Sequence, residues 1–372
     1  MTIPKHTIVI GGGIIGASVA FHLAKSGVRV DVIESRQPAQ GASRVSYAWI
    51  NARDKHPINY HELNRRSQDM WRRFEDDLQT DIGLVWGGEM RWTATETGAR
   101  EFRSRVTELQ SWGYSIREIS PSEAAEIEPD IAFGKVTSVS YTDSDGHVDP
   151  ERVVMGCLST VRHLGGVVHT NESVTSFIRS GDVISHVITT KGTYECDSVV
   201  IAAGAETPKI AEMLGSKFQN THSQGATVIT DILPVPLFKS IAAMHSPRDL
   251  NGVLINSRQL TDGRVMIHGG TQAHSIADES IEDAEMLIQE TAKYLPATQN
   301  LTVQEVRSAL RPMPPDGLPV LGRLVSTPNA YITYTHSGVT LAPMIGEMAA
   351  LEICTGVETE ILAPYRPERF DQ

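Results

Sequence analysis

At the start of the chain, the apolar residues change from a short continuous run to a repeat with helical spacing. The short apolar run His6–Ile10 is typical of a buried parallel strand. From Ile14 to about Ser26 the apolar residues recur at helical spacing, and Gly27 stands where a left-handed glycine ends a helix. Residues 28–33, with the sequence VRVDVI, predict a second strand. This part of the chain therefore predicts a strand, a helix and a second strand.

Further strand and helix patterns follow in the middle of the chain. A buried strand is expected from Ser198, and a helix from near Thr207–Pro208. Three strand-like runs and one amphipathic helix ended by Pro296 come later, and their ranges are 226–231, 252–256, 264–268 and 281–295. Asp262–Gly263, between the last two strand-like runs, is a hairpin-turn signal. These strands are therefore expected to be antiparallel.

The composition is that of a globular protein. Hydrophobic residues make up 40% and charged residues 21% of the 372 residues, a length that favours two domains. The formal net charge of −12 argues against nucleic acid or an anionic membrane surface as the main partner. No apolar run approaches the roughly 18 residues of a transmembrane segment. The start of the chain lacks the features of a signal peptide.

The 3 cysteines, Cys157, Cys196 and Cys354, are odd in number and far apart in the sequence. Their spacing fits neither a disulfide framework nor a zinc site, so no metal is expected. Together with the N-terminal sequence, this favours a cytoplasmic location.

The first predicted strand is followed by a glycine-rich turn, GGGIIG, which contains the pattern G-x-G-x-x-G at Gly11, Gly13 and Gly16. The first glycine of this pattern permits a tight turn, and the second lets the backbone approach a pyrophosphate. The third allows close packing of helix on strand. Because the glycines stand between a strand and a helix, they predict a dinucleotide site rather than a simple turn.

Glu34 closes the second predicted strand, 23 positions after Gly11. An acidic side chain at this place can bond the ribose hydroxyls of an adenosine. It would also repel a 2′-phosphate, which disfavours NADP. These residues alone leave FAD and NAD open.

Three later segments resemble one family, the D-amino-acid oxidase or glycine/sarcosine oxidase type of FAD-dependent oxidoreductase. They are residues 41–51 (GASRVSYAWIN), residues 198–215 (SVVIAAGAETPKIAEMLG) and the stretch 310–343, which contains LRPMPPDGLPVLG and YTHSGVTLAP. The resemblance spans nearly the whole chain. Since NAD-dependent dehydrogenases do not usually carry the second segment, it favours FAD.

The resemblance implies an α/β fold, α+β overall, with two domains. The first is a Rossmann-type FAD-binding domain assembled from residues 1–80, 145–225 and 310–372. The second is a largely antiparallel-sheet substrate domain, of the glutathione-reductase-2-like type, formed by residues 81–144 and 226–309.

The resemblance also implies which residues contact FAD. The amides of residues 338–341, at a helix N-terminus, would bind the N1–C2=O edge of the flavin. Ala309 and Met313 flank the position where sarcosine oxidases carry the attachment cysteine, which implies noncovalent FAD. The expected contacts are Gly11, Gly13, Ile14, Ile15, Gly16, Glu34, Ser35, Arg36, Ala42, Ser43, Arg44, Tyr47, Ala48, Trp49, Val174, Ala203, Gly204, Arg311, Gly338, Val339, Thr340 and Leu341.

Arg311, His336 and Trp49 are the expected catalytic residues. Arg311 stands where the family places the clamp for a substrate carboxylate; the alternative is a structural arginine paired with Asp316 or Glu305. His336 would face the flavin, although a buried structural histidine has the same sequence signature. Trp49 would shape the substrate side.

The expected pocket has further candidates in Tyr47, Asn51 and His56. Relatives often place a tyrosine near Leu254, and its absence here leaves room for a bulkier or secondary amine, such as an opine or an N-alkyl amino acid.

The function implied is oxidation of an amine or amino acid (a D-amino acid, an N-alkyl amino acid or an opine-like compound) to the imine. Hydride passes to flavin N5, and hydrolysis then yields a keto acid or aldehyde and an amine. Oxygen, a quinone or a carrier would reoxidise the flavin. Two alternatives remain: an NAD-dependent dehydrogenase, and an electron-transferring subunit of a hetero-oligomeric opine or glycine dehydrogenase. Besides the hetero-oligomer, a homo-oligomer is the other assembly expected of this chain.

Overall fold

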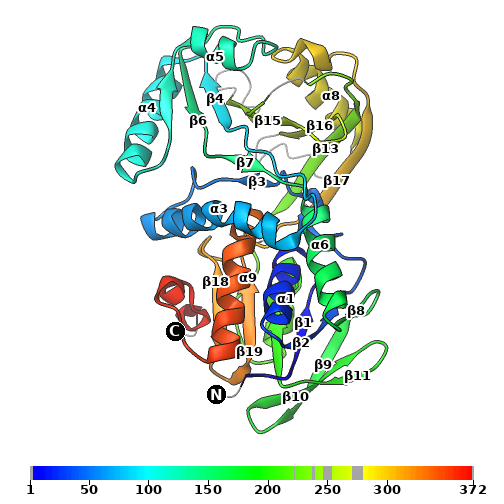
Figure 1. The fold of residues 1–372 in the computed structure, drawn as a ribbon. Coiled ribbons are helices and arrows are strands. Elements are labelled where there is room, and N and C mark those ends of the chain that lie inside the picture. The colour runs from blue at the N-terminus through cyan, green and yellow to red at the C-terminus, as the bar shows by residue number, and fades with distance from the viewer. Residues whose placement is uncertain (1–2, 222, 237–238, 246–253, 270–279, 371–372) are drawn as a thin grey trace.

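The structure, a computed structural model, describes residues 3–221, 223–236, 239–245, 254–269 and 280–370. Two sheets dominate the fold and lie one above the other in Figure 1, with helix α3 (Ile58–Leu78) running between them.

The lower sheet has six strands in the order β18-β19-β12-β1-β2-β8. All neighbouring strands are parallel except β18 and β19. The strands are β1 (His6–Ile10), β2 (Arg29–Ile33), β8 (Val167–His169), β12 (Ser198–Ile201), β18 (Val320–Leu324) and β19 (Thr327–Tyr334). Because β2 lies on one side of β1 and β12 on the other, the strand order reverses at β1. In open α/β sheets, nucleotides bind at this switch point, beyond the carboxyl ends of the strands.

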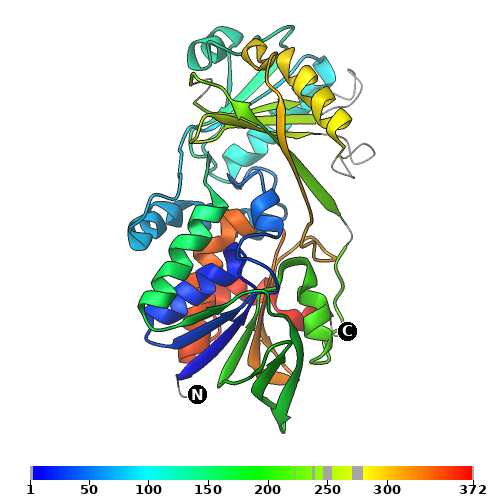
Figure 2. The ribbon, with the colours of Figure 1, turned by 90° about the vertical axis from the view of Figure 1, so that its right-hand side faces the viewer.

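Helices cover one face of this sheet, and a small second sheet lies against the other (Figure 2). The covering helices are α1 (Ile14–Lys25), α6 (Pro150–His163) and α9 (Gly338–Thr355). The small sheet consists of β9 (Val174–Ser180), β10 (Val183–Thr189) and β11 (Thr193–Glu195), next to the short helix α7 (Thr207–Glu212). Apolar side chains on both faces, such as Phe21 and Ile8, are fully buried, so the sheet has a core on each side.

The upper sheet has eight strands in the order β17-β13-β16-β15-β14-β4-β6-β5. Only β14 and β4 are parallel neighbours. The strands are β4 (Glu89–Thr93), β5 (Arg117–Ile119), β6 (Ser138–Thr142), β13 (Gln224–Ile232), β14 (Ile241–His245), β15 (Leu254–Gln259), β16 (Arg264–Gly269) and β17 (Val303–Leu310). Helices α4 (Glu96–Ser111), α5 (Pro121–Ile127) and α8 (Ile281–Ala292) accompany it.

The chain crosses between the two sheets at several points. One crossing contains the short helix α2 (Ala42–Val45) and β3 (Trp49–Ile50), which pairs with β7 (Gly146–His147). Another is the segment from β17 to β18. These crossings bring residues from distant parts of the sequence to the space between the sheets.

The structure confirms the expected α/β fold class, with a parallel sheet and a largely antiparallel one. The hairpin at Asp262–Gly263 is also confirmed, since Gly263 joins β15 to β16 with a φ of +90°. The strand expected at residues 252–256 lies partly outside the described residues. All strands of the lower sheet fall in the ranges assigned to the FAD-binding domain. The domain boundaries themselves remain a prediction.

Two expectations about helices were wrong. The helix expected over residues 281–295 ends at Ala292, because Leu295 precedes a proline and adopts a φ of −127° outside the helical region. The expectation that no apolar run reaches membrane-spanning length missed α9, whose 18 residues have a mean hydropathy of 1.2. Two thirds of α9 is buried against neighbouring elements such as α1 and α3. Its composition therefore reflects a core helix that is packed on several sides.

Candidate active site

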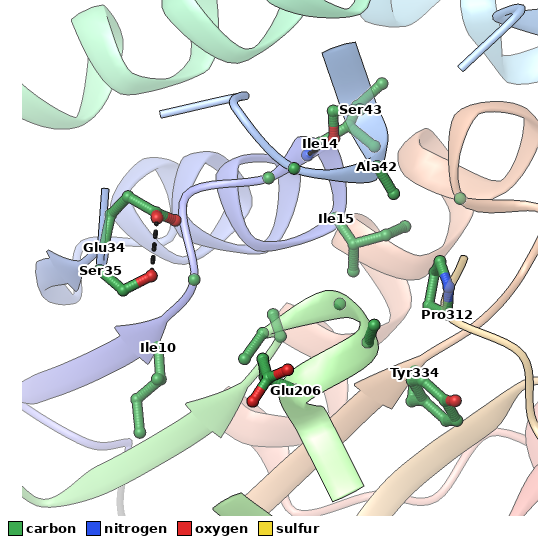
Figure 3. A pocket seen from close by; sticks show the side chains of 18 of the residues that line it. Ile10, Ile14, Ile15, Glu34, Ser35, Ala42, Ser43, Glu206, Pro312 and Tyr334 are labelled. Carbon is green, nitrogen blue, oxygen red and sulfur yellow. Dashed lines mark hydrogen bonds between the residues drawn. The ribbon is translucent and has the colours of Figure 1, made fainter. Parts of the chain in front are cut away.

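A cavity of about 620 Å³ opens at the carboxyl ends of β1, β2, β12 and β19. In Figure 3, Glu34 and Ser35 stand at one end of it, and Pro312 and Tyr334 at the other, with the start of α1 between them. The expected cofactor residues that line this cavity are Gly11, Gly13, Ile14, Ile15, Glu34, Ser35, Arg36, Ala42, Ser43, Val174, Ala203, Gly204, Gly338 and Val339. Sequence reasoning missed Glu206 and Lys209, which also line it.

The glycines of the motif are required by close packing. Gly11 has a φ of +109°, and a Cβ atom there would lie 2.4 Å from the carbonyl oxygen of Ala202. A Cβ at Gly16 would lie 2.0 Å from the carbonyl oxygen of Gly11. Gly16 therefore holds α1 against the turn, and it lines neither this cavity nor the one described below.

The first turn of α1 presents backbone donors to the cavity. Ala17 donates to the carbonyl of Gly13 at 2.9 Å, and the amide of Ile14 donates to Ser43 Oγ at 2.9 Å. The amide of Ile15, which lines the cavity, has no acceptor inside the helix. With the positive end of the helix dipole, this amide suits an oxygen of a diphosphate.

Glu34 binds the backbone of the glycine-rich turn and of its own loop. Its carboxylate accepts from the amide of Gly12 at 2.7 Å and from the amide of Arg36 at 2.8 Å. Ser35 Oγ donates to the same carboxylate at 3.2 Å, as drawn in Figure 3. Because each carboxylate oxygen has two lone pairs, the side chain is oriented and can still accept from ribose hydroxyls.

The first turn of α9 separates this cavity from a second one. Gly338 and Val339 line the first cavity, and Val339 and Thr340 line the second. The amide of Leu341 donates to the carbonyl of Ser337 at 3.0 Å. Leu341 is thus the first residue with an intrahelical bond and lines neither cavity, and its contact with the flavin stays a prediction.

The second cavity has a volume of about 300 Å³ and lies between the sheets. The two cavities adjoin, because they share Ala42, Ser46, Ala309, Pro312, His336 and Val339. The lining of the second cavity includes most of the expected substrate-side residues, which are Tyr47, Trp49, Asn51, Arg311 and His336. It also includes Ala48 and Thr340, which were expected to contact the cofactor. Sequence reasoning missed Lys55, Gly225, Asn256 and His268.

Arg311 directly follows β17 and is held by a neutral histidine. Its guanidinium donates to Nε2 of His268 at 3.0 Å, which requires that nitrogen to be unprotonated. Burial and the nearby Arg311 lower the pKa of His268 to about 4. Burial also lowers the pKa of Arg311.

The two carboxylates proposed as structural partners of Arg311 bond elsewhere. Asp316 pairs with Arg369 at 2.8 Å, and Glu305 pairs with Arg44 at 2.6 Å. The alternative of a structural Arg311 paired with either acid is therefore wrong. Arg44 itself lines neither cavity described above, although it was an expected cofactor contact.

Gly225, near the start of β13, makes room for the Arg311 side chain. A Cβ atom at Gly225 would lie 2.5 Å from Arg311 Nε and 3.3 Å from Cζ. No local pattern in the sequence marks this glycine, since its role depends on β13 pairing with β17, where Gly225 lies opposite Ala309.

Trp49 is fixed by a buried carboxylate behind the cavity wall. Its indole Nε1 donates to Asp145 Oδ2 at 3.0 Å, and the guanidinium of Arg91 lies 5.5 Å from its ring centre. Burial, and then the charge of Glu89, raise the pKa of Asp145 to about 7. Tyr114 also donates to Asp145. The orientation of Trp49 thus depends on residues that do not touch the cavity.

His336 opens into both cavities. Burial by the surrounding protein lowers its pKa to about 4, with further lowering by the positive charges of Lys55 and Arg311. The imidazole is therefore neutral at pH 7 and can donate from one nitrogen and accept at the other.

His56 and Leu254 are the two remaining positions that the sequence singled out. His56 lines neither cavity and packs against Trp112, with ring centres 5.4 Å apart, so the structure does not bring it to the site. Leu254 begins β15, but its side chain lies outside the described part of the structure.

Comparison with known proteins gives one consistent family. The family model described as FAD dependent oxidoreductase matches residues 6–351. A glycine oxidase of Bacillus licheniformis is 27% identical, with 98% of this chain and 97% of that protein aligned. An opine oxidase subunit of Agrobacterium tumefaciens (strain Ach5) is 25% identical, with 97% and 96% aligned.

Solved structures share the fold. The glycine oxidase of Geobacillus kaustophilus superposes with a TM-score of 0.85 at 23% identity, covering 99% of both chains. The L-proline dehydrogenase of P. horikoshii gives a TM-score of 0.83 at 23% identity, covering 100% of this chain and 99% of that one.

Proposed function

Because this chain belongs to the family of FAD-dependent oxidoreductases, we propose that it oxidises an amine or amino acid that carries a carboxylate. The family match overturns the alternative of an NAD-dependent dehydrogenase. The residues present fit FAD, since Gly11 and Gly13 line the cavity beside Ile15, whose free amide suits its diphosphate. None of the 3 cysteines lines either cavity, which supports noncovalent binding.

The side chains of the second cavity suit such a substrate. FAD, when bound, accepts a hydride from a C–H bond next to an amine nitrogen. Arg311 would hold the substrate carboxylate, and its planar group orients such an anion. His336, neutral at pH 7, would accept a hydrogen bond from the substrate amine or donate to its lone pair. Trp49 would form one wall.

The observation that carries this proposal is Arg311 itself. It is a partly buried cation in the cavity, its guanidinium bonds a neutral imidazole, and no described residue lining the cavity is acidic. A buried cation without a counter-charge is costly, and a substrate carboxylate would relieve that cost. The names glycine oxidase, opine oxidase and iminodiacetate oxidase, printed for similar proteins, each indicate an amine substrate that carries a carboxylate. These names support the same substrate class for this chain.

Anaerobic mixing of the FAD-loaded protein with a panel of amines tests the proposal. The panel contains D-alanine, glycine, N-methylglycine, proline and iminodiacetate, and loss of flavin absorbance is the readout. At least one of these compounds should bleach the flavin, whereas N-methylethylamine, which lacks the carboxylate of N-methylglycine, should not. The proposal fails if no compound bleaches the flavin or if the carboxylate makes no difference.

A second candidate is a subunit of a hetero-oligomer that passes electrons to another protein. The observation in its favour is the similarity to two proteins that are named as subunits of an opine oxidase. Turnover by the purified chain with oxygen, compared with turnover with an artificial acceptor such as a quinone, distinguishes the candidates. A free oxidase should turn over with oxygen alone. In either case we propose a cytoplasmic location.

A further inference from the structure

A second cation, Lys55, lines the same cavity as Arg311. It lies in the segment between β3 and α3, whereas Arg311 follows β17, so the two cations enter the cavity from separate parts of the fold. None of the described lining residues is an aspartate or glutamate.

The acid next to Lys55 in the sequence has another partner. Asp54 bonds Arg91 at 3.0 Å and does not line the cavity. Within the described part of the chain, no ion pair or hydrogen bond involves the Lys55 ammonium group. The cavity therefore holds two positive charges and, among its described lining, no negative charge to balance them.

Both cations line the same cavity as His336. The positive charges of Lys55 and Arg311 each lower the pKa of this imidazole. A ligand that reaches both cations would pass beside His336 and beside the first turn of α9, which lines the same cavity.

On the basis of the function proposed above, we infer that the substrate is a secondary amine with a carboxylate on each side of the nitrogen. Arg311 binds one carboxylate and Lys55 the other, which places the nitrogen and its C–H bond between the two anchors. Two carboxylates balance the two cations, whereas a substrate with one carboxylate leaves one of these charges unpaired.

The reaction with such a substrate balances with the cofactor of the family. The C–H bond beside the nitrogen breaks, its hydride reduces FAD, and the N–H proton is released, which leaves a C=N bond. Water then adds to this carbon and the C–N bond breaks. The products are an oxo acid and a primary amino acid.

A binding comparison with two thioethers tests the role of Lys55 without turnover. Thiodiacetate carries two carboxylates and (methylthio)acetate carries one, and sulfur replaces the oxidisable amine in both. Dissociation constants come from perturbation of the flavin spectrum in FAD-loaded protein. Lys55→Met should weaken thiodiacetate by about tenfold or more and leave (methylthio)acetate within about twofold. Lys135→Met, at an exposed lysine outside the cavity, is the matched control.

The same variants are then mixed anaerobically with iminodiacetate and N-methylglycine. In the wild-type protein, a lower concentration of iminodiacetate than of N-methylglycine should bleach the flavin. Lys55→Met should remove this difference between the two amines. Equal weakening of both ligands, or slower reoxidation by oxygen as the sole effect of Lys55→Met, would overturn the inference and leave the proposed function standing. Bleaching by none of the carboxylate amines tested above would instead refute the proposed function.

Discussion

At the scale of single residues, the guanidinium of Arg311 depends on neighbours that the sequence does not reveal. His268 accepts its hydrogen bond, and Gly225 leaves space for its Nε and Cζ atoms. Asp316 and Glu305, the acids nearest in sequence, are engaged by other arginines. The charge of Arg311 is therefore left available inside the cavity.

Replacing Arg311 by Leu should raise KM for a carboxylate substrate by about 100-fold, because a charge-assisted bidentate contact is lost. The FAD content should stay near that of the wild type. Steady-state kinetics with the best compound of the amine panel measure the effect. Arg100→Met, at an exposed arginine that bonds Thr97, should not change KM. An unchanged KM in Arg311→Leu would remove this residue from the substrate site.

Gly225→Ala should disturb the position of Arg311 without removing its charge. The new Cβ would lie 2.5 Å from Arg311 Nε, so the guanidinium must move. We expect KM for the carboxylate substrate to rise by about tenfold or more, with little change in FAD affinity. Gly134→Ala is the control, because no atom lies within 4 Å of the corresponding Cβ. Equal kinetics for the two alanine variants would contradict the role assigned to Gly225.

The histidines of the site predict a pH dependence of stability. The pKa values of His268 and His336 are lowered to about 4 from the ordinary 6.5. The unfolded chain therefore binds more protons than the folded one between these values, so stability falls as the pH drops from 6.5 towards 4. Thermal melts at pH 7.5 and pH 5 should show a lower Tm at pH 5, and the drop should be smaller in His268→Gln. An equal drop in Tm in His268→Gln would exclude His268 as a cause of the pH dependence of stability.

At the scale of elements, the sequence predicted those whose role is local. The glycine motif, the helix behind it and Glu34 lie in one continuous stretch, and their physical requirements are visible in residue type and spacing. Strands β14 and β17 were not predicted. β14 is short and contains two alanines, and β17 carries charged residues, because it lies at the edge of its sheet.

Packing of α9 on α1 gives an element-scale prediction. A Cβ at Gly346 would lie 2.1 Å from Ser18 Oγ, and this hydroxyl donates to the carbonyl of Ala342 at 2.7 Å. Gly346→Ala should push the helices apart and lower the free energy of unfolding by about 1–3 kcal/mol. Urea denaturation of FAD-loaded protein measures this change, with Gly134→Ala again as the reference. A loss no larger than in the reference would show that the helices adapt at this contact.

At the scale of the whole molecule, the second cavity, which we propose as the substrate site, is assembled from both sheets. Arg311, His268 and Asn256 come from the ends or faces of upper-sheet strands, while Trp49 and His336 come from segments next to the lower sheet. Sequence motifs identified much of the first cavity, because its lining comes from a few short segments that each carry a recognisable pattern, such as residues 10–15, 33–46 and 202–206. The substrate half depends on strand order and register, which no motif encodes, so Gly225, His268 and Lys55 were missed.

A buried ion pair connects the two parts. Arg53, in the segment after β3, donates to Glu89 of β4 at 2.7 Å and to Ser140 of β6 at 2.8 Å. Both charged side chains are buried, with exposed fractions of 1% for Arg53 and 0% for Glu89.

Arg53→Met should lower the free energy of unfolding by about 3–5 kcal/mol, because Glu89 loses one of its partners inside the protein. Urea denaturation measures the change. Arg152→Met breaks a pair with Asp81 whose side chains are 41% and 75% exposed, and it should cost about 1 kcal/mol or less. Similar losses of unfolding free energy in the two variants would show that the buried pair stabilises the protein no more than the exposed pair does.

The position of the first turn of α9 has a consequence for biosynthesis. Gly338 and Val339 complete the cofactor cavity that Gly11 begins, so more than 300 residues separate the first and last parts of its wall in the order of translation. A nascent chain that has released only the glycine motif can present the turn proposed to bind the diphosphate but lacks the part of the cavity wall that α9 supplies. If FAD occupies this cavity as proposed, its stable binding follows synthesis of α9, and a ribosome stalled before Gly338 should yield a chain that retains no flavin.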